Sequence, residues 1–125
     1  MAVKHVRSPL GDLEHEILTI LWTHGEMTAH AVRKQIARKL KDPTVRTVLR
    51  RLEEKGYVTH SVVSGQFIYR ATESAERTAA SAIHGIVERF CGGSFERVLL
   101  GLVDAGLIDP GQLAALAGRL KRKPR

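Results

Sequence analysis

Three segments in the first half of the chain place apolar residues three or four positions apart, which is the spacing of one face of an α-helix. These apolar stripes are Leu13, Ile17, Ile20 and Leu21; Ala29, Val32, Ile36 and Leu40; and Val45, Val48, Leu49 and Leu52. Thr28 and Asp42 stand where the N-caps of the second and third helices are expected, and Pro43 follows at the first helical position. Gly56 is expected to end the third helix in a left-handed conformation. The pattern therefore predicts three consecutive helices.

The next segment, YVTHSVVSGQFIYRAT, has β-branched and aromatic residues on either side of Ser64-Gly65. Such runs are typical of strands, and a glycine at this place supplies the positive φ that a tight hairpin turn needs. Three helices followed by a hairpin is the order of a winged helix-turn-helix. We therefore expect a winged-helix, DNA-binding domain over residues 1–72.

Residues 73–125 are predicted to form three further helices, with CGGS ending the first and Asp109-Pro110 opening the last. About fifty residues have too little volume to enclose three apolar helix faces, so we expect a second copy of the segment to cover them in a two-fold dimer. The residues expected in this contact are Ile83, Val87, Phe90, Val98, Leu99, Leu102, Leu113, Leu116 and Leu120. The predicted fold is mostly α with a small β hairpin: a winged helix-turn-helix, then a helical dimerisation region with a basic C-terminal tail.

The third predicted helix has an outer face of hydroxyl and guanidinium groups. At about 100° per residue its four apolar side chains fall on one side, and Thr47, Arg50 and Glu54 fall near the opposite pole. A basic outer face is common on helices that are merely solvated. Arginine, however, can donate two hydrogen bonds to guanine and threonine can contact a thymine methyl group, and helix-turn-helix proteins present this helix to the major groove. The residues expected to contact DNA here are Lys41, Thr44, Arg46, Thr47, Arg50 and Arg51.

The charge of the chain supports a polyanionic partner. Its 125 residues carry a formal charge of +7, with a pI near 10.1. The excess of basic residues lies in residues 1–72 and in the tail from Arg119 to Arg125, while the segment between them is mildly acidic. One cysteine, Cys91, excludes an internal disulfide and fits a reducing compartment. No run of residues predicts a membrane span or a signal peptide, so we expect a cytoplasmic protein.

The chain resembles the penicillinase-repressor (BlaI/MecI/CopY) family of bacterial winged-helix regulators. The resemblance runs from about Leu10 to Lys123 and rests on LGDLEHEILTILW, PTVRTVLRRLEEKGYV, GQFIYRAT and FCGGSFERVLLGLV. It implies a homodimeric transcriptional repressor in which each winged helix reads one half of a pseudo-palindromic operator. It also implies that the C-terminal helices form the dimer.

The sequence departs from the family pattern at three places. Penicillinase repressors are released from DNA when a sensor-linked protease cuts an Asn-Phe bond, but Gly101-Leu102 stands at that place and the chain contains no asparagine. Cys91 alone cannot supply the cysteine cluster of the copper-responsive branch. The wing tip has no basic residue, which leaves His60, Ser64 and Gln66 as its candidate DNA contacts. The sequence therefore supports a repressor without identifying an upstream sensor or protease.

No other chemistry is assembled in the sequence. There is no nucleophile elbow, phosphate-binding glycine loop or metal-ligand motif, so we expect neither an enzyme nor a metal or cofactor site. Two alternatives to a repressor of this kind stay open. One is a winged-helix regulator that senses a small ligand between its two domains, and the other is an adaptor whose winged helix binds a protein and does not read DNA sequence.

Overall fold

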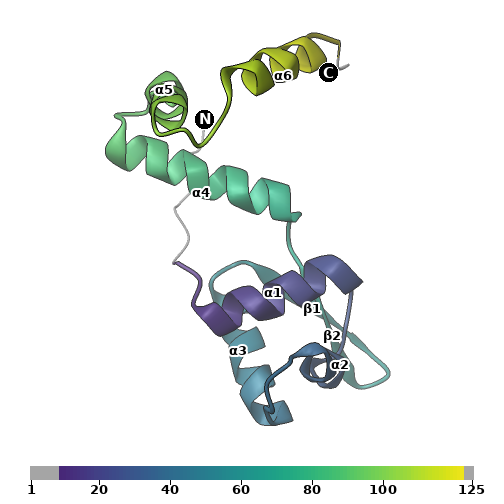
Figure 1. The fold of residues 1–125 in the computed structure, drawn as a ribbon. Helices are drawn as coiled ribbons and strands as arrows, with labels where there is room; N and C mark the ends of the chain where they lie inside the picture. Colours follow the sequence, from purple (N-terminus) through teal and green to yellow (C-terminus); the bar gives the residue numbers. More distant parts are fainter. Residues whose placement is uncertain (1–8, 123–125) are drawn as a thin grey trace. The chain divides into compact units, whose positions relative to one another are not determined.

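The computed structural model describes residues 9–122, so residues 1–8 and the end of the basic tail lie outside the described part. The described elements are α1 (Asp12–His24), α2 (Ala29–Gln35), α3 (Asp42–Glu54), β1 (Val58–Val63), β2 (Gln66–Ala71), α4 (Ala75–Phe90), α5 (Phe95–Asp104) and α6 (Pro110–Arg122). This mostly helical chain with one antiparallel hairpin confirms the predicted fold class (Figure 1). The chain forms two compact units, of which the first ends at Ala82 and the second begins at Ile83.

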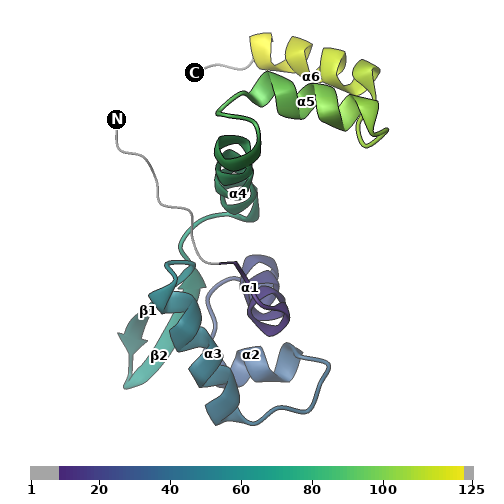
Figure 2. The same cartoon turned by 90° about the vertical axis from the view of Figure 1, so that its left-hand side faces the viewer.

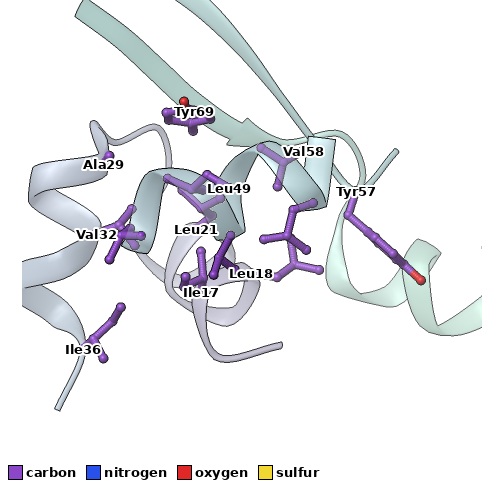
Figure 3. Close-up of a cluster of buried hydrophobic side chains, with 13 residues drawn as sticks. Ile17, Leu18, Leu21, Ala29, Val32, Ile36, Leu49, Tyr57, Val58 and Tyr69 are labelled. Atoms are coloured by element: carbon purple, nitrogen blue, oxygen red, sulfur yellow. The ribbon is translucent and has the colours of Figure 1, made fainter. Parts of the chain in front are cut away.

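The first unit is a winged helix built around one hydrophobic core. Figure 3 shows buried side chains of α1, α2, α3 and the hairpin converging on each other. The three predicted stripes supply most of them, and Ile17, Val45 and Leu49 are fully buried. Because burying a Leu, Ile or Val side chain contributes about 1.5–3 kcal/mol, this core fixes how α3 sits against α1 and α2.

The hairpin forms the wing beside α3 (Figure 2). Ser64 and Gly65 both have positive φ, 51° and 78°, as the two central residues of a type I′ turn require. The turn sets an antiparallel register in which Val58 pairs with Ala71 and Val63 with Gln66. The hairpin turn predicted from the sequence is thus confirmed.

A third, very short strand was not predicted. Met27, between α1 and α2, exchanges two backbone hydrogen bonds with Tyr69 of β2, at 3.0 and 2.7 Å. A single paired residue leaves no periodic signal in a sequence. Its effect is to attach the wing to the start of α2.

A partly buried ion pair ties α1 to the end of α3. Lys55 Nζ lies 2.7 Å from Glu14 Oε1, which also accepts the backbone N–H of Gly11 at 2.8 Å. Burial alone would raise the pKa of Glu14, but these two hydrogen bonds and the nearby charges of Lys55 and Arg51 outweigh it and lower the pKa. Elsewhere in this unit, Trp22 Nε1 donates to the carbonyl of Glu73 at 3.0 Å.

Two helix boundaries differ from the prediction. The second helix was expected to extend to Leu40 but ends at Gln35, because Ile36 adopts an extended conformation (φ −80°, ψ 130°) and reaches the core from it. The third helix was expected to start with Asp42 as its N-cap, but Lys41 holds that position. The carboxylate of Asp42 points to His30 and Arg33 of α2 in place of the free backbone N–H groups of α3. Thr28 caps α2 as predicted, accepting from the N–H of Ala31 at 3.1 Å.

The second unit consists of the end of α4 together with α5 and α6. Ser94 caps α5 and the carboxylate of Asp109 accepts the N–H of Gln112 at the start of α6, so both predicted starts are confirmed. Neither α5 nor α6 has a buried residue. The large apolar side chains that remain exposed in this unit are Ile83, Ile86, Phe90, Phe95, Leu99, Leu100, Leu107, Leu116 and Leu120. Among the described residues, no helix is long and apolar enough to cross a bilayer.

Candidate nucleic-acid interface

Helix α3 divides into a buried face and a charged, exposed face. Its apolar stripe, Val45 to Leu52, lies in the core. Arg46, Thr47 and Arg50 are exposed, and neither guanidinium forms an ion pair or hydrogen bond with a described residue. The Thr47 hydroxyl donates to the carbonyl of Pro43 at 3.0 Å. Two unpaired arginines on a rigid helix are therefore available to bind an anion or a base edge.

A hollow of about 440 Å³ separates this face from the wing. Helix α3 contributes Arg46, Thr47, Arg50 and Glu53, and the hairpin contributes His60, Phe67 and Tyr69. Tyr69 is only 5% exposed, and burial and the charge of Glu53 raise its pKa, an effect that the two arginines partly offset. The hollow thus combines two guanidinium groups, which have no ionic partner within residues 9–122, with the Glu53 carboxylate and an aromatic wall.

A second hollow, of about 340 Å³, brings in the start of α2. Its lining residues are Thr28, Ala29, His30, Arg46, Gln66, Phe67 and Tyr69. Arg46, Phe67 and Tyr69 line both hollows. The exposed face of α3, the inner face of the wing and the N-terminal turn of α2 therefore form one continuous surface, which we call the reading surface.

A chain of contacts joins α3 to the wing within this surface. Oε1 of Glu53 in α3 lies 2.8 Å from Nδ1 of His60 in β1. The His60 ring stacks on Phe67 of β2, with the ring centres 4.1 Å apart and the planes 12° from parallel. This contact set, Glu53–His60–Phe67, holds the wing in a fixed position relative to the arginines.

Asp42 joins α2 to α3 on the same side of the unit. Its carboxylate pairs with Nδ1 of His30 at 3.1 Å and with the guanidinium of Arg33. The hydrogen bond with His30 is the largest effect on the pKa of Asp42 and lowers it. Burial opposes this shift, but the hydrogen bond with Arg33 and the charges of Arg33 and His30 add to it, so the pKa is lowered overall. An anionic Asp42 stabilises the packing of the two helices of the helix-turn-helix.

The structure brings together some of the residues predicted to bind DNA. At least one of the two hollows is lined by each of Arg46, Thr47, Arg50, His60 and Gln66. The remaining four lie beyond the hollows, and all four are exposed: Lys41, Thr44, Arg51 and Ser64. Lys41 occupies the N-cap position of α3 without a side-chain capping hydrogen bond, whereas Ser64 lies in the wing turn.

Other members of the reading surface were not predicted to contact DNA. They are Thr28, Ala29, His30, Glu53, Phe67 and Tyr69. Two of them, Phe67 and Tyr69, could have been found from strand alternation. In this register they share one face of the hairpin with His60, which was already a candidate DNA contact. Among the described residues there is no cluster of three potential metal ligands.

The comparison that decides the family is a match to the penicillinase repressor model over residues 10–122. The chain belongs to the penicillinase repressor family. Its members are regulators, so the chain is a transcriptional regulator and not an enzyme.

Individual relatives agree with this assignment. The penicillinase repressor of Bacillus licheniformis is 23% identical over 97 residues, which cover 76% of this chain and 76% of that protein. An uncharacterized 16.5 kDa protein of Latilactobacillus sakei is 25% identical over 112 residues, or 88% of this chain and 77% of that one. The solved structure of reduced AbfR bound to DNA has the same fold, with a TM-score of 0.50 and 18% identity over 77% of this chain and 71% of that one.

Proposed function

We propose that this member of the family is a sequence-specific DNA-binding repressor that acts as a homodimer on a pseudo-palindromic operator in the cytoplasm. The observation that carries the proposal is that Arg46 and Arg50 have no ionic or hydrogen-bonding partner among the described residues and lie on the exposed face of a helix whose other face is buried in the core. The family membership and the similarity to the penicillinase repressor of Bacillus licheniformis support it.

The N-terminal part of α3 would enter the major groove, as the second helix of a helix-turn-helix does. Arg46 and Arg50 are suited to guanine because each guanidinium can donate two hydrogen bonds to its O6 and N7 atoms. The exposed methyl and hydroxyl groups of Thr44 and Thr47 suit a thymine methyl group or a phosphate. Lys41, Arg51, His60, Ser64 and Gln66 complete the proposed set of contacts, with phosphates supplying most of the salt-dependent affinity.

The second unit would supply the dimer contact. Phe90, Leu99 and Leu120 are 72%, 41% and 59% exposed, and large apolar side chains left exposed in this number are typical of an interaction site. Ile83 and Leu116 are exposed as well, while Val98, Leu102 and Leu113 are half-buried. Val87 is completely buried within the single chain, so it would not touch the second copy itself and would instead pack under the residues that do.

Release from DNA by the cut known for penicillinase repressors is not part of the proposal. Gly101-Leu102 occupies the place of the Asn-Phe bond and lies inside α5. A protease would have to unwind that helix to reach the bond, and the residues it recognises are absent.

The proposal is tested by selecting bound duplexes from a random DNA pool at near-physiological salt, using the full chain, and sequencing them. Enrichment of an inverted repeat supports a dimeric, sequence-specific regulator. Retention of DNA with no enriched motif would contradict it and would favour an adaptor whose basic face matches an acidic protein.

A further inference from the structure

The outer end of the wing carries three exposed apolar side chains and no Lys, Arg, Asp or Glu. Val62, Val63 and Phe67 are 59%, 54% and 48% exposed. No lysine or arginine occurs between Thr59 and Tyr69. A wing that held phosphates by charge would need such residues, so ionic contacts from these residues cannot account for DNA binding by the wing.

The strand register divides these side chains between two faces. Val62 pairs with Phe67 and His60 pairs with Tyr69, and these two pairs are two residues apart along each strand. Their side chains therefore share one face of the hairpin, which runs from the buried Tyr69 outward to the exposed Val62. Val63, paired with Gln66, lies on the opposite face.

The face with Val62 and Phe67 continues the reading surface. Phe67 lines both hollows together with Arg46, and its ring is stacked on His60, which Glu53 of α3 holds in place. The apolar edge of the wing is thus pre-organised next to the free guanidinium groups. A ligand lying on the arginines would meet this edge, which we call the wing strip (Val62 and Phe67).

We infer that the wing strip is a second DNA-contact surface that works by apolar packing against the deoxyribose walls of the minor groove beside each half-site. This inference rests on the proposed function. Apolar side chains are used in minor grooves because the sugar walls and base edges there offer surface that can be removed from water. Such a contact displaces water and no counterions, so it adds affinity without adding to the salt dependence. His60 is a positioning residue that holds Phe67 against the groove.

Two neighbouring valines provide a matched pair for the test. Val62→Ala and Val63→Ala remove the same atoms from residues of similar exposure, but on opposite faces of the hairpin. Affinity for the selected duplex is measured between about 50 and 200 mM salt, where charge-driven binding changes steeply. Because two wings act in a dimer, Val62→Ala and Phe67→Ala are each expected to weaken binding about tenfold, with the slope against salt unchanged. Val63→Ala is expected to stay within about twofold of the wild type.

A charged substitution at the same place gives an independent readout. Val62→Lys puts an ammonium group where the strip meets DNA, so the slope of log affinity against log salt should steepen by about 2 for two wings. An unchanged slope would place the wing tip away from the duplex and overturn the inference.

Three further outcomes also overturn it. Equal losses of DNA affinity for Val62→Ala and Val63→Ala would mean that it does not matter on which face of the hairpin the side chain lies. A shallower slope of log affinity against log salt for Phe67→Ala would mean that the contact is electrostatic. A change of sedimentation mass with unchanged DNA affinity would assign the strip to a protein contact. If the wild type selects no duplex, the proposed function fails as well; if it does and Val62→Ala binds equally well, only the present inference fails.

Discussion

Replacing Arg50 separates the contributions of charge and of base recognition. Arg50 lies on the exposed face of α3, lines the hollow next to the wing and has no ionic partner among the described residues. Its removal should therefore leave the winged helix folded, with a change in unfolding free energy of no more than about 0.5 kcal/mol.

The expected loss of DNA affinity follows from the proposed contact. A bidentate arginine–guanine pair contributes about 1–3 kcal/mol of discrimination, and a dimer would contain two of them. Arg50→Ala should thus weaken binding to the selected duplex by about 2–6 kcal/mol, which is a factor of about 30 or more in Kd. Arg50→Lys keeps the charge but not the two-pronged donor, so it should retain most of the salt dependence and lose most of the sequence preference.

The assay is fluorescence anisotropy with the selected duplex and a scrambled one at several salt concentrations. Arg77→Ala is the matched control, because it removes one exposed arginine of α4 that pairs with Glu73 in the structure. It should change Kd by no more than about twofold. If both Arg50 variants fold and bind the selected duplex like the wild type, the assignment of α3 as the reading helix is wrong.

Three further predictions test the dimer, the ion pair and the core. Leu116→Asp or Leu102→Asp puts a charge on the proposed dimer contact. Either change should lower the mass measured by sedimentation from that of two 13.8 kDa chains to that of one. A mass that stays at the dimer value would contradict the proposed contact. The lowered pKa of Glu14 in the folded state means that its pairing contributes stability above the ordinary value of 4.5, and this stability is lost as the pH falls through the folded pKa. Urea unfolding at stepwise lower pH should show this loss, and a smaller one in Glu14→Gln; identical pH profiles would refute the role of the pair. Leu49→Ala should lower the unfolding free energy by about 2–5 kcal/mol, measured by urea denaturation, because Leu49 is fully buried; a loss below about 1 kcal/mol would contradict its place in the core.

The helices of the winged domain could be predicted from the sequence because each buries a single face. The stripe from Val45 to Leu52 identified both the core side and the outer side of α3, and the structure agrees at every position of that stripe. The end of α2 could not be predicted in the same way. Ile36 and Leu40 continue the helical spacing, but Ile36 enters the core from extended backbone, which periodicity cannot distinguish from a helix.

The contacts between elements were harder to predict than the elements. Asp42 looked like a helix cap because Asp-Pro starts are common, but His30 and Arg33 of α2 compete for its carboxylate, and only the packing of the two helices shows this. The Glu53–His60–Phe67 contact likewise depends on which face of the hairpin meets α3. The register of the hairpin could be derived from its turn. Which face of the hairpin packs against α3 depends on the burial of Tyr69 in the core, and the turn does not determine that.

The central claim is that the exposed face of α3 reads bases, and one selection experiment tests it most directly. The random-pool selection is run in parallel with the wild type, Arg46→Ala and Arg50→Ala. The wild type should enrich a two-fold symmetric motif, and at least one variant should lose its preference at one symmetric pair of positions while keeping the rest. Identical motifs from all three proteins would contradict the claim, because the bases would then be read by some other part of the chain.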